Sequence, residues 1–249
     1  MNHYAYDLRM FYASGAGRLV RRLVSDHLSE LWTDTKGFRV AGYGYAVPYL
    51  RPFAVESERC FALMPAGQGA HTWAAEGNLN QVCLTTEHDF PLETESVDRL
   101  LIVHGLEHAE SAEGLLQEAW RVLRSNGRMI LVVPNRLGLW ARADWMPFGQ
   151  GHPYSSVQIT NLLQQNLFVR EREDKALFMP PFRSLLVLRS AYLVEDIGRI
   201  VFPGLAGLHI VEASKQIYAG IHRGHPARVR VPARVAAVSA PVKNGRNTP

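Results

Sequence analysis

The chain has 249 residues and a net charge of +4, and 47% of its residues are hydrophobic. A chain of this length and apolar content can bury most of a core in one domain, and α/β folds of this size are commonly undivided. Its two cysteines, Cys60 and Cys83, are too few for a disulfide framework and lack the spacing of a zinc site. This cysteine usage favours a reducing, cytoplasmic compartment.

Neither a secretory signal nor a membrane-spanning helix is expected. Asp7 and Arg9 interrupt the apolar run near the amino terminus, where a signal would need an uncharged core. The most apolar region, residues 185–211, contains four charged residues between positions 189 and 199, too many for a helix in lipid. We interpret this region as a buried helix followed by a strand.

Basic residues are concentrated at the carboxyl end, because residues 221–249 contain six arginines and lysines and no acid. The segment is rich in proline, alanine and valine, and it lacks the interleaved aromatic residues on which nucleic-acid bases stack. A solvated, disordered tail is therefore predicted, and binding to nucleic acid is not expected. The alternative, contact with nucleic acid or anionic lipid, rests on charge alone.

Taken in chain order, the apolar periodicity predicts helices that alternate with short buried strands. Residues 4–31 have helical spacing with a break at residues 14–17, and they belong to a leading helical segment over residues 1–35. Ser111 is expected to cap a later helix, and Ser155 with Gln158 has capping-box spacing before another. Strands are expected at residues 38–43, 60–64, 81–84, 99–103, 128–133, 167–179 and 208–219, and further helices at residues 47–53, 111–123, 159–165 and 182–202.

This alternation predicts an α/β fold of the doubly wound type, with an open, mostly parallel sheet and helices on both faces. The α/β domain would span residues 36–220, and the basic tail would follow at residues 221–249. No internal repeat is evident.

Residues 87–135 contain five short motifs in a fixed order. They are Phe90-Pro91-Leu92, Ser96-Val97-Asp98, Gly105-Leu106-Glu107-His108, Glu118-Ala119-Trp120-Arg121-Val122-Leu123, and Gly127-Arg128 before a strand. With this spacing, the block resembles the central part of the class I S-adenosylmethionine-dependent methyltransferases of type 11. The resemblance implies a seven-stranded, Rossmann-like sheet over roughly residues 36–219. It also implies S-adenosylmethionine as cofactor, and an in-line methyl transfer that depends mainly on orientation.

The resemblance also implies where the cofactor binds, because ligands of doubly wound sheets lie across the carboxyl ends of the strands. The turns after the first four strands would converge at that edge. The cofactor-binding residues carried over on this basis are Gly42, Gly44, Tyr45, Ala46, Met64, Thr86, Glu87, His88, His104 and Gly105.

The turn after the first strand departs from the family pattern, in which an acid is followed by three alternating glycines. Gly42 stands at the place of the acid, and Gly44 keeps the first glycine. Ala46 and Pro48 replace the other two glycines. Because proline has no amide hydrogen and a fixed φ, this turn does not reproduce the usual cradle for the methionine end of the cofactor.

Two further cofactor contacts of the family are changed. Apolar residues around Met64 occupy the place of the acid that holds the ribose hydroxyls. Thr86 occupies the place of the acid near the adenine amino group, where the neighbouring Glu87 could compensate. Because losing a charge-assisted hydrogen bond costs about 1.5 to 3 kcal/mol, the three changes together predict weaker cofactor binding.

The end of the fourth strand supplies the catalytic candidates. His104 and His108 lie near the expected meeting point of methyl group and acceptor, and an imidazole with a pKa of about 6.5 can act as a base near neutral pH. Tyr154 is a third candidate. The alternative role of Glu107 and His108 is to brace the following helix. No metal is expected, because this cluster lacks a supporting cysteine or a distant ligand.

Residues 136–154 form a long loop, rich in aromatic and polar side chains, above the fifth strand. Such loops often carry function, so this one is interpreted either as a lid over the methyl acceptor or as a protein interface. Residues 185–210 are a second candidate interface. Two functions are compatible with the sequence: a methyltransferase acting on a small molecule or protein, and a catalytically inactive methyltransferase-like protein that binds a protein partner.

Overall fold

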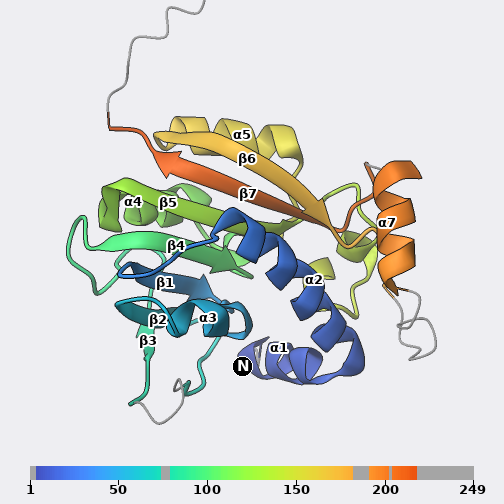
Figure 1. Ribbon diagram of the computed structural model, residues 1–249, viewed down its shortest axis with the longest axis horizontal. Coiled ribbons are helices and arrows are strands. Elements are labelled where there is room, and N and C mark those ends of the chain that lie inside the picture. Colours follow the sequence, from blue (N-terminus) through green and yellow to red (C-terminus); the bar gives the residue numbers. More distant parts are fainter. Residues whose placement is uncertain (1–3, 74–78, 182–190, 202–203, 218–249) are drawn as a thin grey trace, which may run out of the picture. The chain divides into compact units, whose positions relative to one another are not determined.

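The computed structural model describes residues 4–73, 79–181, 191–201 and 204–217 (Figure 1). Residues 1–218 belong to one compact unit. The predicted tail at residues 221–249 therefore lies outside the described residues, as does the first half of the helix predicted at residues 182–202.

The centre of the fold is a seven-stranded sheet with the order β3-β2-β1-β4-β5-β7-β6. The strands are β1 (Arg39–Gly44), β2 (Arg59–Pro65), β3 (Val82–Thr85), β4 (Val97–Val103), β5 (Leu123–Pro134), β6 (Phe168–Ala176) and β7 (Leu208–Lys215). β7 runs antiparallel to both of its neighbours, β5 and β6, and the pairs among β1 to β5 are parallel. The predicted mostly parallel α/β sheet is confirmed, and each predicted strand overlaps one that the structure contains.

Serine side chains cap the starts of three of the helices in the described residues. The helices are α1 (Tyr4–Ala13), α2 (Gly15–Leu31), α3 (Val47–Ala54), α4 (Ala112–Val122), α5 (Ser156–Gln165) and α7 (Ala191–Val201), with short 3-10 turns η1 (Leu106–His108), η2 (Trp140–Arg142) and η3 (Pro147–Gly149). Ser14 breaks the first helical run by capping α2, and its hydroxyl accepts a hydrogen bond from the Gly17 amide at 3.1 Å. Ser111 caps α4, and the predicted capping box opens α5.

Two apolar cores cover the two faces of the sheet, because successive residues of a strand point to opposite sides. On β1, Val40 belongs to the core that contains α1, α2 and α3, whereas Ala41 belongs to the core that contains α4 and α5. The leading helices thus share the main core, with Leu8 and Val20 fully buried. All four carboxyl ends of β1 to β4 meet at the edge that α1 overhangs (Figure 1).

The interpretation of residues 185–211 as wholly buried is wrong for the last turns of α7. Ile197, Ile200 and Val201 are 59%, 81% and 55% exposed. α7 is attached to the segment after β6 through Glu195, a buried residue whose carboxylate accepts hydrogen bonds from the amides of residues 177–179. β7 is buried as expected. No helix in the described part of the chain is long and apolar enough to cross a membrane.

Candidate functional site

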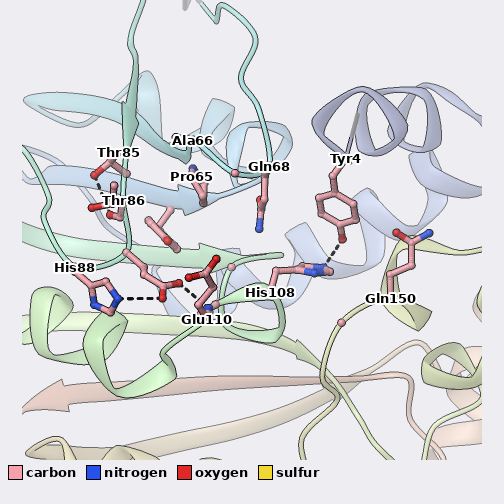
Figure 2. A pocket seen from close by; sticks show the side chains of 16 residues that line it. Tyr4, Pro65, Ala66, Gln68, Thr85, Thr86, His88, His108, Glu110 and Gln150 are labelled. Atoms are coloured by element: carbon pink, nitrogen blue, oxygen red, sulfur yellow. Dashed lines mark hydrogen bonds and ion pairs between the residues drawn. The ribbon is translucent and has the colours of Figure 1, made fainter. Parts of the chain in front are cut away.

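A cavity of about 570 Å³ opens at the carboxyl edge of the sheet. Residues 65–68 after β2, residues 85–88 after β3, and Gly105 with residues 108–110 after β4 form most of its wall. Tyr4 of α1 and Gln150 complete the wall from the opposite side (Figure 2). Ligand sites of α/β sheets lie at such an edge, next to the point where the strand order reverses, here between β1 and β4.

The turn after β1 is packed tightly against β4. Gly44 has a φ of +77°, and a Cβ atom on it would lie 2.3 Å from the carbonyl oxygen of Val103. The next amide, that of Tyr45, donates a hydrogen bond to the same oxygen at 2.7 Å. Glycine is therefore required here both by the backbone conformation and by the close approach of β4. The Tyr45 amide is used within the protein.

Gly42 lies behind this turn, against α3. A Cβ atom on Gly42 would lie 2.7 Å from both Cβ of Ala46 and Cδ1 of Leu50. This position, where the family carries an acid, has no room for any side chain because helix and strand approach closely. The departure at Gly42 is thus part of how α3 packs on β1.

The ten predicted cofactor-binding residues divide into two groups. Thr86, Glu87, His88 and Gly105 line the cavity, whereas Gly42, Gly44, Tyr45, Ala46, Met64 and His104 lie outside its wall. Met64, Tyr45 and His104 are at most 4% exposed. Contact between these residues and a cofactor stays a prediction.

Glu87 has a structural task at the cavity wall. Its two carboxylate oxygens accept hydrogen bonds from the amides of Glu110 and Ser111, at 2.9 and 2.6 Å. An anion is favourable at this place, because the amides precede the first turn of α4. His88 lies 3.3 Å from the same carboxylate. Glu87, the acid that the resemblance suggested for the adenine, therefore fixes the start of α4.

Above β1 the edge is closed by hydrogen-bonded aromatic side chains. The hydroxyl of Tyr49 donates to that of Tyr12 at 3.0 Å, and the Tyr12 hydroxyl lies 2.9 Å from Nε2 of His104. The ring of Tyr12 stacks on Tyr45 at 5.6 Å between centroids. Burial raises the pKa of both Tyr12 and Tyr49, so these hydroxyls stay protonated and act as donors.

His104 and Glu107 extend this hydrogen-bonded group into the interior. With Tyr12 donating to Nε2 of His104, Nδ1–H of His104 donates to Oε1 of Glu107 at 3.2 Å. Both side chains are almost fully buried. His104 has a φ of +50°, an uncommon conformation that costs about 1 to 3 kcal/mol and is frequent at functional sites. The imidazole is thus held in place by the tertiary structure.

Tyr4 and His108 meet at the cavity wall, where the Tyr4 hydroxyl hydrogen-bonds to Nε2 of His108 (Figure 2). Burial lowers the pKa of His108, and the nearby charge of Glu107 opposes this shift only in part. Burial also raises the pKa of Tyr4. At neutral pH a neutral imidazole therefore accepts a hydrogen bond from a protonated phenol.

Of the three catalytic candidates, the structure brings His108 to the cavity. His104 is fully buried behind it, and Tyr154 is half-buried, with its hydroxyl 3.5 Å from the carbonyl oxygen of Leu106. Sequence reasoning missed Tyr4 and Gln150, which reach the cavity from distant parts of the chain. No local pattern marks either residue, because both are placed by contacts far along the sequence.

The aromatic loop at residues 136–154 is mainly part of the core. Trp140 and Phe148 are 0% and 2% exposed, which contradicts the expectation of an exposed aromatic patch. The Trp140 indole donates to the carbonyl oxygen of Met179 at 2.7 Å, and Phe148 packs against the His104 ring. Trp145 is 45% exposed. The loop contributes Gln150 to the cavity, and its expected role as a lid or a protein interface stays a prediction.

Residues 41–131 match the family model described as a methyltransferase domain. The matched range runs from β1 into β5 and contains the turns after β2, β3 and β4 that form most of the cavity wall. Among curated proteins, no sequence matches this chain.

Solved structures of the same fold cover most of the chain at low sequence identity. A SAM-dependent methyltransferase from Thermotoga maritima is 16% identical, with a TM-score of 0.55 over 86% of this chain and 100% of its own. Another from Archaeoglobus fulgidus is 16% identical, with a TM-score of 0.55 over 83% of this chain and 96% of its own. A chain from the Haloferax volcanii complex containing the Trm112 methyltransferase activator is 12% identical, with a TM-score of 0.56 over 85% and 98%. At these identities the likeness establishes a shared fold.

Proposed function

We propose that this chain, of which residues 41–131 match the model of a methyltransferase domain, transfers a methyl group from S-adenosylmethionine to an unidentified small molecule or protein. S-adenosylmethionine is the cofactor that the family implies. The observation that carries the proposal is the cavity at the carboxyl ends of β2, β3 and β4. This edge is where α/β sheets bind their ligands.

The cavity suits the adenosine part of the cofactor in size and chemistry. Its volume of about 570 Å³ lies within the range of small-molecule sites. Thr86 and Glu87 offer a hydroxyl and a carboxylate after β3. The loop after β2 is open at Gly67, where a Cβ atom would meet no other atom within 4 Å. We assign the adenine to the turn after β3 and the ribose to the loop after β2.

The methionine part of the cofactor needs a different cradle from the usual one, because the Tyr45 amide is already bonded to Val103. Gly105 and His108 line the remaining wall, next to Tyr4. The cofactor supplies a methyl group bound to a positively charged sulfur. These wall residues would orient the acceptor towards it and exclude water.

Calorimetric titration of the native chain with S-adenosylmethionine and S-adenosylhomocysteine tests the proposal. Micromolar binding of both compounds is expected. The variant Gly67→Trp places an indole in the open part of the cavity and should weaken binding at least tenfold without changing the melting temperature. Gly204→Trp is a matched control, since Gly204 also has no atom within 4 Å of its Cβ position but lies outside the cavity wall.

Methyl transfer itself is measured with methyl-labelled cofactor and a fractionated cell extract. Label in the low-molecular-weight fraction would identify a small-molecule acceptor, and label in the macromolecular fraction would identify a protein. A folded native chain that binds neither cofactor form would contradict the proposal. So would binding that is unaffected by Gly67→Trp.

The exposed side chains of α7 favour a second function, binding to a protein partner. Ile197, Ile200 and Val201 present an apolar surface on a single helix, and such surfaces often form interfaces. A folded chain that binds no cofactor, yet elutes as a larger species that Ile200→Lys converts to the monomer, would support this function over methyl transfer.

A further inference from the structure

We propose that His104, Glu107 and His108 form a binding site for a divalent transition-metal ion beside the cavity, although the sequence pattern by itself led us to expect no metal there. The potential ligand atoms of these three side chains lie within 4.8 Å of one another. Imidazole nitrogen and carboxylate oxygen are ligands that Zn²⁺, Fe²⁺ and Co²⁺ share in proteins. The sequence spacing had suggested this cluster but no metal, and the structure adds that the donor atoms of the three side chains converge.

Glu107 provides the main evidence for this site. Its side chain is 1% exposed, and Oε1 lies 3.2 Å from Nδ1 of His104. Oε2 is fully buried and has no hydrogen-bond partner among the described residues. A buried carboxylate oxygen without a partner is unfavourable, and coordination to a cation would satisfy it. No other role described above uses this atom.

Hydrogen bonds with two tyrosines orient the two imidazole rings, as residues in the second coordination sphere orient metal ligands. The hydroxyl of Tyr12 lies 2.9 Å from Nε2 of His104, and the hydroxyl of Tyr4 bonds to Nε2 of His108. For Nδ1 of each ring to bind an ion, the hydrogen of the neutral imidazole would move to Nε2 and be donated to the tyrosine oxygen, and Nδ1 of His104 would exchange its hydrogen bond to Glu107 for the ion. Histidine ligands are commonly oriented through their second ring nitrogen in this manner.

The backbone also prepares the three side chains to converge. His104 has a φ of +50°, and the tight turn η1 follows at once with Glu107 and His108. A tetrahedral ion with bonds of about 2.0 to 2.2 Å draws its ligands to within roughly 3 to 4 Å of one another. The three side chains therefore need only a small inward movement. Metal sites with three protein ligands keep a further position open.

The open position connects the site to the cavity. His108 and Gly105 line the cavity wall, while His104 and Glu107 lie behind it. A water molecule or an oxygen atom of a ligand in the cavity would complete the coordination. The site itself does not depend on methyl transfer, so its test is made without S-adenosylmethionine.

The test is titration of the chelator-treated full chain with Zn²⁺ by calorimetry and with Co²⁺ by visible absorption. One ion per chain with micromolar affinity is expected, together with the Co²⁺ absorption bands of a coordinated site. Glu107→Gln keeps the shape of the side chain and should weaken binding at least tenfold. Glu173→Gln is the matched control, because it alters another carboxylate paired with a histidine, His209 at 3.0 Å, and should leave affinity unchanged.

His108→Ala provides a second variant, since this half-buried residue is easier to remove than the buried Glu107. It should weaken Zn²⁺ binding at least tenfold while the chain keeps its native circular dichroism. Absence of Zn²⁺ and Co²⁺ binding by the native chain would overturn the site. Equal loss in Glu173→Gln, or no loss in the folded His108→Ala, would also overturn it.

Discussion

The carboxyl edge of the sheet is closed above β1 and open above β2 and β3. Above β1, Tyr12 of α1 stacks on Tyr45 and accepts a hydrogen bond from Tyr49 of α3. Above β2 and β3, small and polar residues such as Gly67 and Thr86 leave a cavity. The same edge of the sheet is therefore covered by packed side chains above β1 and contains the candidate site above β2 and β3. The difference depends on which side chains the neighbouring helices bring to each strand end.

The closed region accounts for the missing glycines of the first turn. In the family pattern this turn approaches the methionine end of a cofactor. Here the Tyr45 amide donates a hydrogen bond to the carbonyl oxygen of Val103, and Ala46 occupies the space that a side chain at position 42 would need. The substitutions noted in the sequence therefore belong to a packed, hydrogen-bonded unit. The open region contains the cavity in which we propose that the cofactor binds.

The largest effect is expected at Gly44, which joins the closed region to β4. Gly44→Ala should lower the free energy of unfolding by at least about 3 kcal/mol, because it adds strain at positive φ and a clash with Val103. Gly37→Ala is the control: Gly37 also has a positive φ, of +72°, but no atom lies within 4 Å of its Cβ position. Its loss should be about 1 kcal/mol. Urea denaturation measures both, and equal losses would show that the close approach to β4 is unimportant.

Tyr12→Phe breaks the hydrogen bonds of the closed region without removing its aromatic packing. The variant should lose about 1 to 3 kcal/mol of stability, since the Tyr49 hydroxyl and Nε2 of His104 each lose a buried partner. Tyr6→Phe changes a tyrosine that is 60% exposed and should be close to neutral. Thermal and urea unfolding compare the two. A neutral Tyr12→Phe would mean that packing alone closes this region.

Thr86→Ala tests the open region. If adenine binds after β3, loss of the Thr86 hydroxyl should cost about 1 kcal/mol of S-adenosylhomocysteine binding, roughly a fivefold change, because one hydrogen bond is removed. The stability of the chain should not change, since this residue is exposed. Thr33→Ala alters another exposed threonine away from the cavity. Equal affinities for both variants would remove Thr86 from the site.

The smallest expected effect is on the pH dependence of stability, and it comes from ionisation of Tyr45 in the closed region at alkaline pH. Burial raises the pKa of Tyr45 to about 12, although Arg9 opposes the shift. Because the folded pKa exceeds the unfolded value of about 10, the unfolded chain releases this proton first, and stability falls as pH rises above 10. In Tyr45→Phe, stability should fall less steeply above pH 10. Below pH 9 its pH dependence should match that of the native chain. Unfolding at a series of alkaline pH values measures the slope, and an unchanged slope would show that Tyr45 is not protected from ionisation.

Local sequence patterns were sufficient for the elements. The break at Ser14, the cap at Ser111 and the capping box at Ser155 each depend on contacts within three residues, so a short window contains the whole signal. The central strands β1, β4 and β5 were visible as short apolar runs because both faces of a parallel sheet are buried there. The motif block at residues 87–135 gave the resemblance to methyltransferases and with it the expectation of a seven-stranded sheet.

Exposure was harder to predict than element type. Trp140 and Phe148 stand in an irregular loop without periodicity, and nothing local distinguishes a buried aromatic side chain from an exposed one. The apolar residues at the end of α7 show the opposite error, because they were expected to be buried and are exposed. Burial depends on what the rest of the chain places opposite a residue, and periodicity carries no information about that.

By itself, the sequence determined the α/β class, the positions of strands and caps, and a resemblance to methyltransferases that the family model matches over residues 41–131. Tertiary structure alone decided which strand ends are closed, that Tyr4 meets His108, and that His104 and Glu107 form a buried pair behind the cavity. The physical reason is distance along the chain. The Tyr4–His108 and Tyr12–His104 contacts join residues 104 and 92 positions apart, and such pairs are selected by packing of the whole core and not by any local preference.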